Sequence, residues 1–139
     1  MGKTTKMQVE RILGHPMWSG TPEEAVFEAD REKELWYEYQ GADGSAGRTT
    51  VVMNRNRVVV AVLVYPKKAL PLRRAIELYG SQYVEKKWNP CLTERERGQI
   101  KNKDKPPLET FLVYPEKGMI LMAGEYGDIW EIVYLLRCP

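Results

Sequence analysis

Residue types that commonly carry chemistry are scarce in this chain. Its 139 residues include one histidine, His15, and two cysteines, Cys91 and Cys138. His15 lies between Gly14 and Pro16 with no nucleophile motif nearby, so a Ser-His-Asp arrangement has no support. Three soft ligands at no recognised spacing do not make a structural zinc site. We therefore expect no catalytic residue, no metal site and no bound cofactor.

Other absences exclude further classes. The glycine-rich stretch 41–47 lacks the Lys-Ser/Thr pair of a phosphate-binding loop and joins two strands instead of opening a helix. No apolar run approaches the roughly 18 residues of a membrane span. The two cysteines have no CxxC spacing, and the sequence leaves open whether they form a disulfide. A net charge of +2 is too small to argue for nucleic acid by itself.

The location of the protein depends on its N-terminus. No signal peptide precedes the first helix signal, which predicts a cytoplasmic protein for the chain as it stands. A Met-Gly start can also be an expression scar added where a leader was removed, and in that case we expect the bacterial envelope or periplasm.

What the chain does contain is an alternation of helix and strand patterns. Thr5 and Gln8, and again Thr21 and Glu24, form capping-box motifs that mark helix starts. The helix signals cover residues 5–14, 21–33 and 70–79, and a further capping-box motif begins at Thr93. The strand signals cover residues 35–40, 49–53, 58–65, 110–114, 119–122 and 129–136. A hairpin turn is expected at 54–57, where asparagine tolerates positive φ.

These elements run in the same order twice. Gly14 and Gly80 are 66 residues apart, Thr21 and Thr93 are 72 apart, and Tyr39 and Tyr114 are 75 apart. We therefore predict an α+β fold in which residues 1–139 form one domain of two repeat units, 1–68 and 69–139. Each unit is a helix-helix-three-stranded antiparallel meander, and the helices pack on one face of a shared antiparallel sheet.

This order, together with one motif, carries a resemblance. The phrase Arg11-Ile12-Leu13-Gly14-His15-Pro16, followed by Trp36-Tyr37-Glu38-Tyr39, is similar to the opening of the SmpA/OmlA (BamE-like) half-unit. Two such units in tandem resemble the β-lactamase-inhibitor-protein fold, which implies protein binding by the sheet face. That family has a disulfide within each unit, whereas this chain has one cysteine in each unit. The resemblance therefore transfers no inhibitory activity and no binding residue.

The aromatic residues of the strands are the most informative feature for function. Alternation places Tyr37 and Tyr39 on one face of their strand and Trp36 on the other. In the last strand, Trp130 and Tyr134 share a face with Ile132. Helices on one side leave the other side of the sheet available, and large amphipathic side chains there form a binding face.

We expect Trp36 in the core, and we take Tyr37, Tyr39, Trp130 and Tyr134 as candidate contacts. The leading hypothesis is a non-enzymatic protein-binding or scaffold domain whose partner is another protein. The sequence does not indicate an oligomeric state.

Two alternatives remain open. One is a small-ligand carrier or small enzyme with a pocket between sheet and helices, using carboxylates such as Glu38 or Glu131. The other is single-stranded nucleic-acid binding, because aromatic strands are accompanied by the basic residues Arg48, Arg55, Arg57, Lys67, Lys68, Arg73 and Arg74. Acidic residues on the same strands make nucleic acid the weaker alternative.

Overall fold

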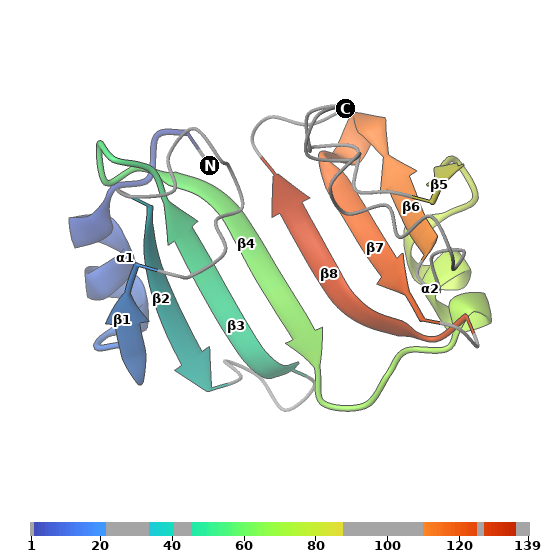
Figure 1. Ribbon diagram of the computed structural model, residues 1–139, viewed down its shortest axis with the longest axis horizontal. Helices are drawn as coiled ribbons and strands as arrows, with labels where there is room; N and C mark the ends of the chain where they lie inside the picture. The colour runs from blue at the N-terminus through green and yellow to red at the C-terminus, as the bar shows by residue number, and fades with distance from the viewer. Residues whose placement is uncertain (1, 22–33, 41–45, 88–109, 125–126, 136–139) are drawn as a thin grey trace, which may run out of the picture.

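The strand signals of the sequence assemble into a single sheet. The computed structural model describes residues 2–21, 34–40, 46–87, 110–124 and 127–135, and these form two α-helices and an eight-stranded antiparallel sheet (Figure 1). The α+β class is thereby confirmed. The helix expected over residues 21–33 lies outside the described residues apart from Thr21, and so do the motif at Thr93 and both cysteines.

Each half of the sheet comes from one half of the chain. The first half contains α1 (Lys6–Leu13), β1 (Trp18–Gly20), β2 (Leu35–Gln40), β3 (Ala46–Met53) and β4 (Val59–Pro66). The second half contains α2 (Leu72–Tyr79), β5 (Val84–Lys86), β6 (Thr110–Tyr114), the 3₁₀ turn η2 (Pro115–Lys117), β7 (Met119–Ala123) and β8 (Ile129–Leu135).

The two halves meet at the centre of the sheet. The strand order is β1-β2-β3-β4-β8-β7-β6-β5, so the last strands of the two halves, β4 and β8, are neighbours. They pair antiparallel from Ala61 opposite Leu135 to Val64 opposite Ile132. The short strands β1 and β5, which the sequence did not predict, form the two edges.

Local sequence accounts for the limits of the helices. At the start of α1, Gln8 N–H donates to Thr5 Oγ1 (3.4 Å) and Thr5 N–H donates to Gln8 Oε1 (2.9 Å), which confirms the predicted capping box. Both helices end at a glycine with positive φ, Gly14 (φ +77°) after α1 and Gly80 (φ +95°) after α2. No described helix is long and apolar enough to cross a membrane.

One turn differs from the expectation. In the β3–β4 turn, Asn54 Oδ1 accepts hydrogen bonds from the backbone N–H groups of Asn56 (2.9 Å) and Val58 (3.2 Å). The positive φ, +59°, falls on Arg57 and not on an asparagine. The asparagine side chain therefore serves as the hydrogen-bond acceptor that closes the turn.

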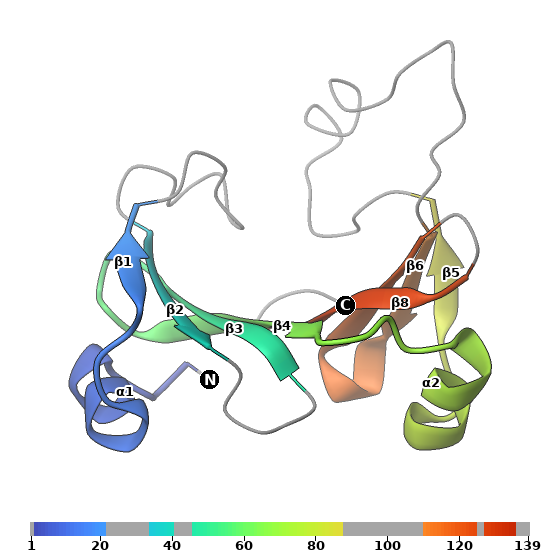
Figure 2. The ribbon, with the colours of Figure 1, turned by 90° about the horizontal axis from the view of Figure 1, so that it is seen from below.

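Helices α1 and α2 pack on the same face of the sheet, which we call the proximal face (Figure 2). The sheet bends away from them toward both edges, so the opposite or distal face is concave. Two apolar clusters lie on the proximal face, one around Val9 of α1 and one around Ala75 of α2. A third cluster lies on the distal face and consists of Val52, Val60, Ala61, Leu63, Phe111, Val113, Ile120, Val133 and Leu135.

Candidate functional site

Two of the four aromatic residues expected on a binding face lie beneath a helix. Tyr37 and Tyr39 are buried on the proximal face under α1, with exposed fractions of 4% and 7%. The Tyr37 hydroxyl donates to Glu10 Oε1 (2.5 Å) and the Tyr39 hydroxyl donates to the Gly14 carbonyl oxygen (3.2 Å). The expectation that these two tyrosines face a partner is therefore wrong, because their hydroxyl groups anchor α1 to the sheet.

The other two candidate residues, Tyr134 and Trp130, do not share a surface. Tyr134 is half-buried on the proximal face, where it packs against the cluster around α2 and hydrogen-bonds Tyr79. Trp130 is at the surface, with 36% of the residue exposed. The pairing of β7 with β8 shifts register at Met122/Ala123, which leaves Trp130 as the extra residue of a bulge. The bulge takes Trp130 out of the alternation that had grouped it with Tyr134.

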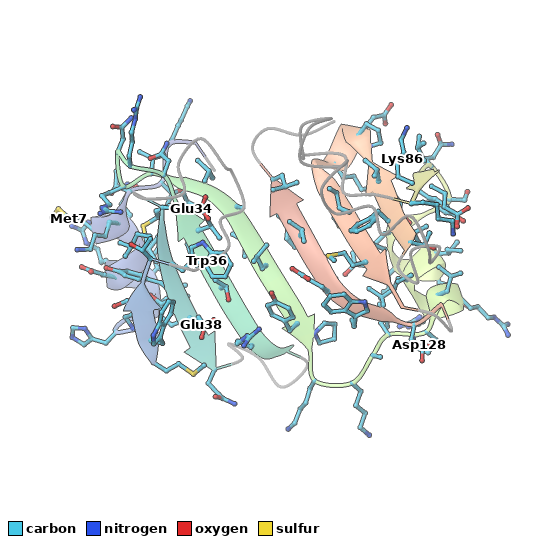
Figure 3. All side chains as sticks on the ribbon, in the orientation of Figure 1. Met7, Glu34, Trp36, Glu38, Lys86 and Asp128 are labelled. Carbon is cyan, nitrogen blue, oxygen red and sulfur yellow. The ribbon has the colours of Figure 1, made fainter. Side chains whose placement is uncertain are left out.

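Trp36 also lies on the opposite face of the sheet from the one that we expected. It packs against the distal cluster, half-buried, and not between sheet and helices. Its indole Nε1–H donates to Glu34 Oε1 (2.6 Å), and Glu34 is fully buried. In Figure 3, Glu34 lies just before β2, and Trp36 and Glu38 follow it along the strand.

Charge is distributed unequally between the two faces. Strands β2 to β4 and β6 to β8 contain three charged residues, Glu38, Arg48 and Glu131. Cross-strand pairing places all three on the distal face. Their partners on the neighbouring strands belong to the distal cluster or adjoin it. The proximal face of these strands is uncharged, as expected where helices cover it and an ion would lose its hydration.

Two of the three charged side chains, those of Arg48 and Glu131, act on one aromatic ring, that of Tyr65. The Arg48 guanidinium carbon lies 4.3 Å from the centroid of the Tyr65 ring, which is a cation–π contact. Arg48 Nη1 also lies 4.0 Å from Glu38 Oε1. Burial, followed by the negative charge of Glu131, raises the pKa of Tyr65 to about 12, while the positive charge of Arg48 acts in the opposite direction. Tyr65 therefore links the first half of the sheet to Glu131 of β8.

A tryptophan extends this group to the edge of the sheet. Trp18 of β1 pairs directly with Glu38, so both side chains lie on the distal face. A Cβ at Gly20 would lie 3.0 Å from the Trp18 ring, so the glycine leaves room for the indole to lie along β1. We call the set Trp18, Trp36, Glu38, Arg48, Tyr65 and Glu131 the distal strip.

Three members of the distal strip reach solvent. Trp18 is 43% exposed, the Arg48 side chain is 44% exposed and the Glu38 side chain is 20% exposed. Glu131, at 8%, is as buried as the residues of the distal cluster, which are at most 8% exposed. The exposed part of the distal strip therefore lies at Trp18, Arg48 and Glu38.

A buried hydroxyl group adjoins the strip. Thr50 lies opposite Glu38 in the β2–β3 pairing and two residues from Arg48 along β3. It is fully buried, and its Oγ1 has no hydrogen-bond partner. A buried hydroxyl without a partner costs about 1–3 kcal/mol, so it is an unusual group to find in a sheet unless it has a use.

Sequence reasoning missed Trp18, Thr50 and Tyr65 as members of a site. Strand alternation already placed Trp36 and Glu38 on the face opposite Tyr37, and this pattern was the one sequence feature that pointed to the strip. The sequence did not show which face of the sheet α1 covers.

Within the described residues, no group of three or more histidine, cysteine or acidic residues is arranged to hold a metal ion. Comparison with known proteins gives no match to a family model, to a curated protein or to a solved structure.

Proposed function

We propose that this chain is a non-enzymatic protein-binding or scaffold domain that contacts its partner through the distal strip. The supporting observation is that all three charged residues of the six longer strands lie on one face, where Arg48 stacks on Tyr65, approaches Glu38 and has two tryptophans on the same face. Tryptophan, tyrosine and arginine are the residues that most often dominate the binding energy of protein interfaces. A strip that joins both halves of the sheet offers a partner one continuous contact.

We also propose that the two halves are repeat units, 1–68 and 69–139. The Tyr39 hydroxyl donates to the carbonyl of Gly14 (3.2 Å), and the Tyr114 hydroxyl donates to the carbonyl of Gly80 (2.8 Å). In each half, a strand tyrosine thus holds the glycine that ends the helix. This equivalence supports the Gly14–Gly80 and Tyr39–Tyr114 pairings, and with them the resemblance to tandem β-lactamase-inhibitor-protein-like units.

A small-ligand carrier or small enzyme is the second candidate. Glu38 and Glu131 do lie on the same face, with the unpartnered Thr50 hydroxyl beside Glu38. A ligand that used these groups would protect the protein against thermal unfolding without any partner protein. Such stabilisation by a small molecule would favour this candidate over protein binding.

Nucleic-acid binding gains no support from the arrangement of charge. Of the basic residues that suggested it, Arg48 lies on the distal face with Trp18 and Trp36. Arg55 and Arg57 lie in the β3–β4 turn, and Arg73 and Arg74 lie on α2. A stacking platform needs its aromatic residues and its basic groove on one surface.

The test compares baits that differ in one surface. The wild type, the double variant Trp18→Ser/Arg48→Glu and the control Arg73→Glu on α2 are immobilised, and retained proteins are quantified by mass spectrometry. Arg73 is a suitable control because its side chain is 93% exposed and lies away from the strip. We expect proteins retained by the wild type and by the control to be lost from the double variant. Equal retention by all three baits, with unchanged melting curves, would refute the proposal.

A further inference from the structure

The ring of Trp18 lies over the backbone of Gly20 on the distal face. A Cβ at Gly20 would lie 3.0, 3.3 and 3.6 Å from three consecutive atoms of the six-membered ring. A ring that met this position edge-on would hold the two outer atoms farther away, so the ring covers Gly20 with one of its faces. Trp18 is nevertheless 43% exposed. Because the inner face is covered, the outer face of the indole provides a flat surface on which another ring can stack.

A second tryptophan lies next to this surface. Gly20 pairs directly with Trp36 in the β1–β2 register, so the Trp18 ring covers the position across from Trp36. Trp36 is half-buried and its indole Nε1–H already donates to Glu34 Oε1 (2.6 Å). Both side chains lie on the concave face of the sheet (Figure 2). Trp36 therefore adds apolar surface beside Trp18 without adding a hydrogen-bond donor.

Beside Trp18, hydrogen-bond donors are more exposed than acceptors. No described residue accepts a hydrogen bond from the Trp18 indole N–H. Arg48 stacks on Tyr65, with 4.3 Å from the guanidinium carbon to the ring centroid, and it also hydrogen-bonds the Tyr65 hydroxyl. Its Nη1 lies 4.0 Å from Glu38 Oε1, which is beyond hydrogen-bond distance. Since a guanidinium carries five N–H donors, Arg48 keeps donors for a ligand, and its side chain is 44% exposed against 20% for Glu38.

The charges of the strip lie close to one another. Arg48 lies between Glu38 and Tyr65, and the Tyr65 hydroxyl also hydrogen-bonds Glu131, which is buried. An acidic group that approached Arg48 would also meet the negative charge of Glu38, and a basic group that approached Glu38 would meet the positive charge of Arg48. This arrangement favours an uncharged ligand.

We propose that the distal strip binds a proline-rich segment of a protein partner, with proline rings stacked on Trp18 and backbone carbonyl groups accepting hydrogen bonds from the Trp18 indole and from Arg48. A run of prolines is uncharged and has no backbone N–H, so it offers acceptors alone to a surface whose exposed groups are mainly donors. Its extended helix forms before binding, and aromatic surfaces therefore bind it at a low cost in entropy. The inference rests on the proposed function and names the class of the partner segment.

The first experiment locates the binding site with a peptide probe. The wild type is titrated with acetylated and amidated octaproline, and separately with a glycine-serine peptide of equal length and with cellohexaose. Binding is followed by NMR through the indole N–H signals. We expect octaproline to shift the Trp18 signal to saturation and the glycine-serine peptide to leave it in place. A saccharide stacks on a similar ring but needs acceptors as well as donors, so we expect weaker binding of cellohexaose.

The second experiment compares variants by the fluorescence anisotropy of labelled octaproline. Gly20→Ala keeps Trp18 but places a Cβ where the far end of its ring lies, so the ring must move and binding should weaken about tenfold. Trp18→Ser should weaken binding about thirtyfold or more, as for a tryptophan that dominates an interface. Leu78→Ser on α2 is the matched control, because it removes an apolar side chain that is 51% exposed on a helix of the proximal face. It should bind octaproline like the wild type.

The outcomes separate this proposal from the proposed function. Absence of octaproline binding, or equal binding by the wild type, Gly20→Ala and Trp18→Ser, overturns the proline-rich partner even if the bait experiment identifies the strip as the binding surface. Tighter binding of cellohexaose than of octaproline also overturns it and assigns the strip to a saccharide. Equal retention by all three baits refutes the proposed function alone, because octaproline reports on the strip directly. Gly20→Ala decides the result if Trp18→Ser does not show the wild-type melting curve.

Discussion

At the scale of single residues, polar groups of the distal strip that have partners lie beside one hydroxyl group that opposes stability. Cation–π and hydrogen-bond contacts satisfy Arg48 and Tyr65. Thr50, in contrast, contributes a buried hydroxyl with no partner. Proteins commonly keep such unsatisfied groups where function requires them, and the cost is borne by the rest of the fold.

Thr50→Val should stabilise the protein. Valine has nearly the shape of threonine but no hydroxyl group, so the substitution removes the desolvation cost of Oγ1 and raises the free energy of unfolding by about 1 kcal/mol. Urea unfolding monitored by tryptophan fluorescence measures the change. Thr50→Ser is the control, since it keeps the hydroxyl, loses the methyl group and should be destabilising. A Thr50→Val protein less stable than wild type would show that the hydroxyl is satisfied in solution.

At the scale of elements, the two helices are held in the same way at their C-terminal ends. Gly14 has φ +77° and ψ −153°, and Gly80 has φ +95° and ψ +177°. This combination of angles is essentially restricted to glycine. In each case the glycine carbonyl accepts a hydrogen bond from a tyrosine hydroxyl of the sheet, so the backbone conformation positions the helix on the proximal face.

Gly14→Ala and Gly80→Ala should each lower the free energy of unfolding by about 1–3 kcal/mol. The cost is one of backbone strain, because a Cβ at either position meets no atom within 4 Å. Chemical denaturation of the two variants measures it, with Ser81→Ala at an exposed neighbouring position as the control. Costs similar to that of Ser81→Ala would mean that the helix ends adopt other angles in solution.

At the scale of the whole molecule, both faces of the sheet contain tyrosines whose pKa values are raised. Burial, with the hydrogen bond to Glu10, raises the pKa of Tyr37 to about 12 on the proximal face. Burial and Glu131 raise the pKa of Tyr65 to about 12 on the distal face. Burial also raises the pKa values of Tyr39, Tyr114 and Tyr134.

These shifts predict a loss of stability at high pH. An unfolded tyrosine releases its proton near pH 10, whereas native Tyr37 and Tyr65 hold theirs to about pH 12. The stabilisation is therefore fully present below pH 10 and is lost as the pH rises through 12.

Urea unfolding at several pH values from 8 to 11.5 provides the measurement. The double variant Tyr37→Phe/Tyr65→Phe should be less stable at pH 8 and should lose less stability as the pH rises. Parallel curves for wild type and variant would assign the alkaline transition to other groups.

Much of the secondary structure follows from interactions between residues close in sequence. The capping box needs only Thr5 and Gln8, which are three positions apart, and the glycine stops at Gly14 and Gly80 are set by backbone sterics. The β-branched runs of β4 and β6 form strands close to their expected limits. Such features depend on local energies, and local energies can be read from the order of residues.

The residues of the proposed binding face could not be obtained in this way. Alternation separates Tyr37 from Trp36, but which of the two faces the helices is decided only when α1 docks and Glu10 and Gly14 accept the tyrosine hydroxyl groups. The edge strand β1, only three residues long, forms because β2 offers it hydrogen-bonding partners. The meeting of Arg48, Tyr65 and Glu131 likewise depends on the pairing of β4 with β8, between residues far apart in the chain. Local preferences determine where helices and strands form, whereas long-range contacts alone determine which side chains share a surface.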